Sequence, residues 1–103
     1  MPRLDRFHSD DFDYLFQAIL SLEDMEECQA FFGDLFTIQE LKTFSQRLQV
    51  ARCLLKGDTY DAIRKQVQAS SSTITRINTE LQFGSGGYGK IIRRIDGEAP
   101  ADE

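Results

Sequence analysis

Apolar residues recur every three or four positions along most of the chain, which is the spacing of amphipathic α-helices. Between residues 59 and 81 this spacing predicts two short helices in succession. In the first, Ile63 and Val67 fall on one face, and the hydroxyl of Thr59 can cap the first turn. This helix should end near residue 67 or 68, because the serines at 70–72 favour caps and turns over helix interiors.

The second short helix is predicted to begin at Ser71, with Ser70 as its cap. Ile74, Ile77 and Leu81 follow at spacings of three and four and form one apolar stripe. The opposite side is polar and carries Ser71, Ser72, Thr75, Arg76 and Thr79. We therefore expect this helix to bury one face and to present the other at the surface.

Two short helices joined by a tight turn are a means of presenting the second helix to the DNA major groove. Short hydroxyl side chains let a helix approach base edges closely, and a helix N-terminus attracts phosphate oxygens. The alternative, a plain amphipathic helix with a solvated polar face, stays open on periodicity alone. The candidate DNA-binding residues are Arg64 and Lys65 of the first helix and Ser71, Ser72, Thr75, Arg76 and Thr79 of the second.

Cap signals predict further helices: from Ser9 or Asp10 to about Leu20, from Asp24, and from Thr37 to a stop at Gly57. The glycine-rich segment at 84–89 is expected to be a flexible joint before a short basic helix. The helix from Thr37 has the clearest signal, because Thr37 and Glu40 have the spacing of a capping box. No segment is a strand candidate. The chain is therefore predicted to be all-α.

A chain of 103 residues makes one small domain that can bury only a limited core by itself. Aromatic residues are plentiful, with eight Phe and three Tyr. The N-terminal segment carries more apolar surface than one helix face can hide, in Phe7, Phe12, Tyr14, Leu15, Phe16, Ile19, Leu20 and Leu22. This excess favours an obligate oligomer whose N-terminal helices are buried against a second copy.

Three parts are expected within this domain. Residues 1–36 would form N-terminal helices for dimerisation, and residues 37–82 the long helix and the DNA-binding pair. Residues 83–103 would form a glycine-rich joint, a short basic helix and an acidic tail that frays.

Charge is separated along the chain. The net charge is −5, which on its own argues against a DNA-binding protein. Nine acids and two bases in residues 1–34 give −7, whereas four acids and ten bases in residues 35–95 give +6. The last eight residues carry four acids and no base, giving −4. The basic charge therefore falls in the part that holds the helix pair, as DNA binding requires.

Nothing in the sequence points to catalysis or to a metal centre. The one histidine, His8, lies near the N-terminus, and no nucleophile–base pair or metal cluster is recognisable. Cys28 and Cys53 lack metal-ligand spacing and are expected to be buried reduced thiols. The GSGGYG segment at 84–89 has the glycine spacing of a dinucleotide-binding loop, but a helix is expected before it where such a loop follows a strand. We therefore predict a protein that is not an enzyme and holds no metal.

The N-terminus resembles no signal peptide, because acids fill residues 5–13 and no apolar run is long enough. A cytoplasmic location without membrane contact is therefore expected.

Several segments together resemble the tryptophan repressor and its relatives. These are LFTIQEL at 35–41, QRLQVARCLLKG at 46–57 and TITR at 73–76, so the resemblance covers about residues 35–82. The GSGGY segment at 84–88 is similar to the YerC/YecD-type subgroup of that family. The resemblance implies an all-α, intertwined homodimer that binds operator DNA through a helix-turn-helix and represses transcription.

Residue by residue, Ser71, Ser72 and Thr75 match positions where the family's recognition helix meets DNA. Arg64 matches a basic residue of the preceding helix that also approaches the DNA. Thr37, Arg47 and Arg76 match the corepressor pocket, in which two arginines enclose the indole ring of tryptophan. Such cation–π stacking contributes roughly 0.5–2 kcal/mol per contact.

The chain departs from the family pattern mostly around this pocket. Ile77 stands where the family has glycine and would shrink the pocket, while Glu80 stands where it has serine and would repel a ligand carboxylate. The candidate effector pocket therefore consists of Thr37, Arg47, Arg76, Ile77 and Glu80; it suits a small-molecule corepressor, if any, and disfavours L-tryptophan. Two further departures are Asp61 in place of a basic DNA-side residue and Gln68 at a turn position that usually holds glycine. A left-handed conformation at Gln68 would cost about 1–2 kcal/mol.

The leading hypothesis is a sequence-specific DNA-binding regulator, a homodimeric repressor that uses the helix-turn-helix on double-stranded DNA. The alternative is a helical protein-interaction or dimerisation module that kept the fold and lost DNA binding. The neutral serines of the second helix, Asp61 and the negative net charge favour this alternative.

Overall fold

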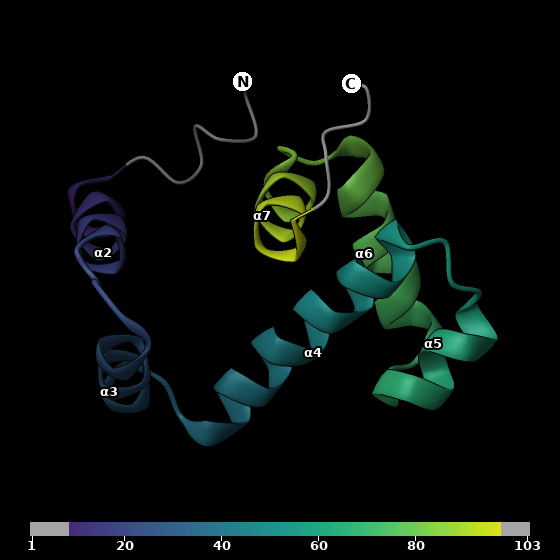
Figure 1. Cartoon of the computed structure of the whole chain (residues 1–103), viewed down its shortest axis with the longest axis horizontal. Helices are drawn as coiled ribbons and strands as arrows, with labels where there is room; N and C mark the ends of the chain where they lie inside the picture. The colour runs from purple at the N-terminus through teal and green to yellow at the C-terminus, as the bar shows by residue number, and fades with distance from the viewer. Residues whose placement is uncertain (1–8, 98–103) are drawn as a thin grey trace. The chain divides into compact units, whose positions relative to one another are not determined.

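The computed structural model describes residues 9–97, and within this range the chain forms six α-helices and no strand (Figure 1). The helices are α2 (Asp10–Leu20), α3 (Met25–Leu35), α4 (Ile38–Leu55), α5 (Tyr60–Val67), α6 (Ser71–Phe83) and α7 (Gly87–Asp96). The prediction of an all-α chain is confirmed. None of these helices is both long enough and apolar enough to span a bilayer. Phe7, His8 and the expected acidic tail beyond Gly97 lie outside the described residues.

Side-chain caps fix where most of the helices begin. Ser9 Oγ accepts from the backbone N–H of Phe12 (3.1 Å), so Ser9 is the cap of α2. At α4 the capping box is complete: Thr37 Oγ1 accepts from Glu40 N at 3.1 Å, and Glu40 Oε1 accepts from Thr37 N at 2.8 Å. Each bond satisfies a backbone donor that the first helical turn leaves unpaired, which explains why these residues start the helices.

The cap of α3 differs in one detail from the capping box of α4. Asp24 Oδ1 accepts from Glu27 N at 2.8 Å, as a cap should. Glu27 Oε1, however, accepts from the N–H of Glu23, one residue before the cap, at 3.0 Å. The side chain is long enough to reach the preceding residue, so the return bond of the capping box shifts by one position.

The chain divides into two compact units, one ending at Lys42 and the other beginning at Thr43. The first unit contains α2, α3 and the start of α4, and neither α2 nor α3 has a buried residue. Its exposed large apolar side chains are Phe12, Tyr14, Phe16, Leu20, Met25, Leu35 and Ile38. One chain therefore leaves this apolar surface uncovered. The sequence predicted three parts with different roles, in dimerisation, in DNA binding and as a joint with a tail. The division into two compact units does not test these roles, so they stay a prediction.

The second unit holds the core of the described residues. Side chains from α4, α5, α6 and α7 meet there, together with one residue of the α5–α6 connection. The buried members are Val50, Ala51, Cys53, Ile63, Ala69, Ile74, Ile77 and Ile92. Because every helix of this unit contributes, the core fixes α5 and α6 against α4 and α7 (Figure 1).

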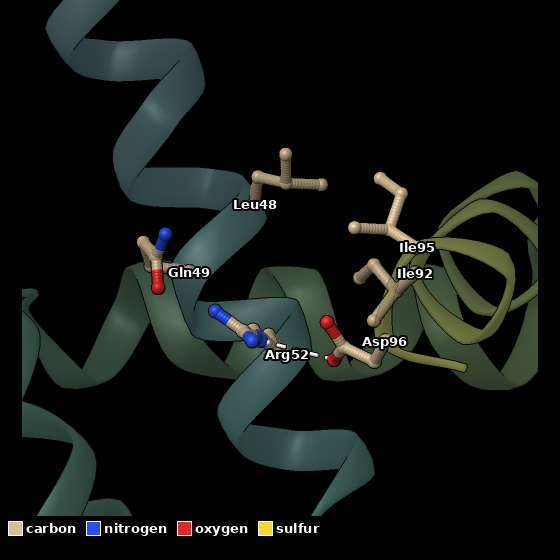
Figure 2. Close-up of a pocket in the computed structure, with 6 residues that line it drawn as sticks. All are labelled: Leu48, Gln49, Arg52, Ile92, Ile95 and Asp96. Carbon is tan, nitrogen blue, oxygen red and sulfur yellow. Dashed lines mark hydrogen bonds and ion pairs between the residues drawn. The ribbon is translucent and has the colours of Figure 1, made fainter. Parts of the chain in front are cut away.

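A polar contact and a small cavity lie between α4 and α7 (Figure 2). Arg52 Nε donates to Asp96 Oδ2 at 3.0 Å. Beside this ion pair, Leu48 of α4 faces Ile92 and Ile95 of α7 across a cavity of about 160 Å³. The ion pair thus joins the last turn of α4 to the last residue of α7.

Candidate nucleic-acid interface

Helix α5 and the start of α6 lie where the sequence predicted them, and α6 continues beyond the predicted Leu81 to Phe83. Thr59 Oγ1 caps α5 by accepting from Ala62 N at 3.1 Å, and Ser70 Oγ caps α6 by accepting from Thr73 N at 3.2 Å. Helix α5 ends at Val67, and α6 begins at Ser71. A three-residue connection therefore separates the two helices, as in a helix-turn-helix.

The connection depends on Gln68, which has φ 60° and ψ 35° in the left-handed region. It is the one residue other than glycine with positive φ among residues 9–97. Its N–H donates to Arg64 O, which ends α5, and Ala69 then turns into the core at 4% exposure. The left-handed conformation expected at this position is confirmed. Its backbone strain is tolerated because burial of Ala69 and the cap at Ser70 fix the residues that follow.

Helix α6 is divided into a buried and an exposed side. Ile74 is completely buried and Ile77 is 2% exposed. The candidate DNA-binding residues on both helices are exposed: Arg64, Lys65, Ser71, Ser72, Thr75, Arg76 and Thr79. The stripe at spacings of three and four thus directs the hydroxyl-bearing side outward. Contact between these candidate residues and DNA stays a prediction.

Hydroxyl groups at the start of α6 bond mainly to one another. Ser70 Oγ donates to Thr73 Oγ1 at 3.0 Å and lies 3.1 Å from Ser72 Oγ. Further along, Thr79 Oγ1 donates to Thr75 O at 3.0 Å, so its hydrogen is already used within the helix. The Thr75 hydroxyl, by contrast, has no hydrogen-bond partner among the described residues. Thr75 is therefore the hydroxyl most available to an outside partner.

Arg64 connects the two helices of the pair. Its Nη1 donates to Ser71 Oγ at 2.6 Å, and its Nη2 forms an ion pair with Asp61 Oδ1 one turn earlier in α5. Lys65 and Arg76 form no ion pair with any residue of the 9–97 range. Arg64 is therefore already engaged by protein groups, whereas Lys65 and Arg76 are available to phosphates.

The charge of the second unit suits a polyanion. Residues 43–95 contain three acids and nine bases, a balance of +6, and the four acids of residues 96–103 reduce the net charge of the unit to +2. The positive balance of residues 43–95 arises because the acids of the chain concentrate before residue 35 and after residue 95. An interface for DNA thus has its counter-charge in the same unit as the helix pair.

The residues of the candidate effector pocket belong to different environments. Thr37 caps α4 in the first unit. In the second unit, the Arg47 guanidinium lies 5.8 Å from the ring centroid of Phe44, one turn earlier in α4. Ile77 is a core residue, and Glu80 is half-buried on α6. The buried Ile77 side chain occupies space that a glycine would leave empty.

Two cavities in the described part of the chain are lined by other residues. One is the cavity beside Arg52 and Asp96 in the second unit (Figure 2). The other, of about 400 Å³, lies in the first unit and is bordered by Cys28, Gln29, Phe32 and Leu41. Neither includes a residue of the candidate effector pocket.

Cys53 is buried, as expected, and its thiol donates to Gln66 Oε1 at 3.7 Å. Burial raises the pKa of this thiol, and the nearby carboxylate of Asp58 raises it further through its charge and a hydrogen bond. The cations of Lys56 and Arg52 lower the pKa by less. A thiol in such surroundings stays protonated and unreactive, in keeping with a structural role. Cys28 is only half-buried, in contrast to the expectation, because α3 has no buried position in one chain.

Comparison with known proteins places this arrangement in a family. The sequence pattern of the Trp repressor protein family matches residues 10–96. The uncharacterized protein YerC of Bacillus subtilis (strain 168) is 42% identical over 93 residues, which are 90% of this chain and 89% of that protein. The chain belongs to the Trp repressor family.

Solved structures agree with this assignment. The crystal structure of a candidate Trp repressor from Staphylococcus aureus matches with a TM-score of 0.86 and 41% identity, over 91% of this chain and 94% of that one. A TrpR-like protein from Eubacterium eligens ATCC 27750 matches with a TM-score of 0.85 and 39% identity, over 89% and 95%. The Trp repressor-like fold therefore extends over nearly the whole described range.

Membership in the Trp repressor family bears on the predicted chemistry. Proteins of this family are regulatory DNA-binding proteins and not enzymes, so the chain is not an enzyme. Proteins of the Trp repressor family also bind DNA. The resemblance inferred from the segments at 35–57 and 73–76 is thus confirmed.

Sequence reasoning missed two ion pairs in the described part of the second unit, Asp61–Arg64 and Arg52–Asp96. Asp61 was noted only as an unusual acid, although its spacing of three from Arg64 is one at which helix side chains meet. Arg52 and Asp96 are 44 residues apart, so no local pattern links them.

Proposed function

We propose that this protein is a homodimeric, sequence-specific transcriptional repressor that acts on double-stranded DNA in the cytoplasm. The observation that carries the proposal is the α5–α6 pair, in which Ile74 and Ile77 are buried while Ser71, Ser72 and Thr75 are exposed. In a Trp repressor-family chain, this side of α6 would enter the major groove. Lys65 and Arg76 would contact DNA phosphates on either side of that groove.

A second copy of the chain is part of the proposal. Helices α2 and α3 have no buried residue, and large apolar side chains such as Phe12 and Tyr14 are exposed in one chain. Burying them against a second copy would stabilise the dimer by about 25 cal/mol for each Å² of apolar area removed from water. In such a dimer the two α6 helices would lie on one side, about 34 Å apart, to reach successive major grooves.

Binding to DNA at two salt concentrations tests the function. A duplex selected from a random pool and a shuffled duplex of the same composition would be titrated with the full chain. Lys65 and Arg76 of two protomers offer four phosphate contacts, so affinity should fall about 100-fold between roughly 50 and 200 mM salt. Equal affinity for both duplexes, or affinity indifferent to salt, contradicts the proposal.

A protein-interaction module without DNA binding is the second candidate function. The pairing of Arg64 with Asp61 favours it, since this cation is partly neutralised before any DNA arrives. The exposed apolar side chains of α2 and α3 would then serve another protein. If selection from the random pool enriches no duplex although the chain forms a stable dimer in solution, this function is supported over the first.

For the effector we propose that L-tryptophan is not the corepressor. Ile77 is buried in the core and Glu80 adds a carboxylate on the next turn of α6. A ligand with its own carboxylate would be repelled there, whereas one without it would not. A thermal-shift screen with amino acids and their amides tests this, and a rise in melting temperature with L-tryptophan would contradict it.

A further inference from the structure

The Asp61–Arg64–Ser71 contact brings together an acid, a base and a hydroxyl at the start of the recognition helix. Arg64 Nη1 donates to Ser71 Oγ at 2.6 Å, while Nη2 of the same guanidinium pairs with Asp61. The Arg64 side chain is 42% exposed and that of Asp61 is 76% exposed. The guanidinium is thus bound on two of its nitrogens at an accessible surface.

The geometry limits what this cation can do on DNA. An arginine that moves freely neutralises any phosphate within reach and so strengthens binding to every sequence equally. A guanidinium held by two partners must exchange the Asp61 carboxylate for a phosphate before it gains anything. The remaining exposed carboxylate would then lie beside the phosphate and repel it.

We infer that Asp61 is a positioning residue that keeps the Arg64 guanidinium on Ser71 and thereby limits binding to non-specific DNA. This inference rests on the proposed function, because it concerns which DNA the α5–α6 pair prefers. Held in this way, the Arg64 guanidinium stays bonded to Ser71, the first residue of α6, and fixes the orientation of the Ser71 hydroxyl. Lys65 and Arg76 remain the cations that neutralise phosphates without regard to sequence.

Removing the charge of Asp61 is the central experiment. Asp61→Asn keeps the shape of the side chain and frees Arg64 for phosphate in both protomers. Two added phosphate contacts should steepen the slope of log affinity against log salt by about 1.8. Affinity for the shuffled duplex should rise about tenfold at roughly 50 mM salt, and affinity for the selected duplex by less than about threefold.

Two further variants separate positioning from general charge. Asp34→Asn changes the net charge by the same amount on an exposed residue of the other unit, so it should leave the slope and the ratio of affinities unchanged. In the Arg64→Gln background, Asp61→Asn should have no effect on that ratio, because there is no guanidinium left to release. An undiminished effect in that background would mean direct repulsion of phosphate and would overturn the positioning role.

A measurement without DNA distinguishes failure of this inference from failure of the proposed function. Hydrogen exchange at the Arg64 guanidinium, followed by NMR, should be slow in the wild type and several-fold faster in Asp61→Asn. Equal rates would overturn the inference whatever the DNA results. A wild type that binds DNA selectively, with an unchanged slope and ratio in Asp61→Asn, would overturn the inference alone. A wild type that does not select among duplexes would overturn the proposed function, and with it the role of Asp61 in selection.

Discussion

Arg52 Nε and Asp96 Oδ2 lie 3.0 Å apart and tie the end of α4 to the end of α7 across 44 residues of sequence. The Asp96 side chain is 16% exposed and that of Arg52 is 47% exposed. Asp96 also sits at the C-terminal end of its helix, where a negative charge is unfavourable. Arg52 therefore stabilises a carboxylate that its own helix disfavours.

We expect Arg52→Met to lower the free energy of unfolding by about 1 kcal/mol, because it leaves the Asp96 carboxylate without its partner. Urea unfolding at one fixed protomer concentration measures this. Arg94→Met removes the same charge from an exposed position of α7 and should change stability by less than about 0.5 kcal/mol. Adding Asp96→Asn to Arg52→Met should recover part of the loss. If the two single changes are additive, the pair does not contribute to stability.

Gln68→Gly should stabilise the protein by about 0.5–1 kcal/mol. A non-glycine residue at φ 60° costs about 1–2 kcal/mol, and glycine avoids this cost. The greater backbone entropy of glycine in the unfolded chain offsets roughly half of the gain. Urea unfolding of the variant measures the gain. As a control, Gln82→Gly places glycine at an exposed helical position of α6 and should destabilise by about 1 kcal/mol. Equal effects of both changes would show that the left-handed conformation at Gln68 is not strained.

Local signals account for what the sequence predicted well. The caps at Thr37, Thr59 and Ser70 act over three residues, so the spacing of residue types is enough to find them. The left-handed turn at Gln68 followed from the family resemblance, because Gln68 stands at a turn position that usually holds glycine. The buried and exposed sides of α6 followed from its apolar spacing.

Contacts between distant residues account for what the sequence did not predict. The Arg52–Asp96 pair depends on how α4 and α7 pack, and burial of Ala69 depends on the whole core. Arg64 was expected to meet DNA, but its bonds to Asp61 and Ser71 depend on the angle between α5 and α6. The candidate effector pocket is still less accessible to local reasoning, because Thr37 and Arg76 belong to different units.

The stability of the protein should fall as the pH rises above 9.0, with a contribution from Cys53. Its pKa is raised from 9.0 in the folded chain, mainly by burial, so the folded state keeps the proton that the unfolded state loses. The stabilisation is complete below the unfolded value of 9.0 and is lost as the pH rises through the folded pKa.

Urea unfolding of wild type and Cys53→Ala between about pH 7 and 10.5 isolates this contribution. The variant should be less stable at pH 7, because it loses buried volume, but its stability should decline less above pH 9.0. Cys28→Ala, which removes the half-buried thiol of the first unit, is the matched control. Parallel curves for wild type and Cys53→Ala would contradict the assigned role of the thiol.

Thr75→Ala should weaken binding to the selected duplex by about 1–3 kcal/mol and leave binding to a shuffled duplex nearly unchanged. The reason is that the Thr75 hydroxyl is exposed and has no partner within residues 9–97, so a base edge can take it. Its backbone oxygen already accepts from Thr79, and this bond within α6 is unaffected by the change. Fluorescence anisotropy with both duplexes at one salt concentration measures the two affinities. Thr43→Ala makes the same change at an exposed position of α4 and should alter neither. An equal loss on both duplexes would assign Thr75 to the DNA backbone instead of the bases, since only a base contact distinguishes sequences.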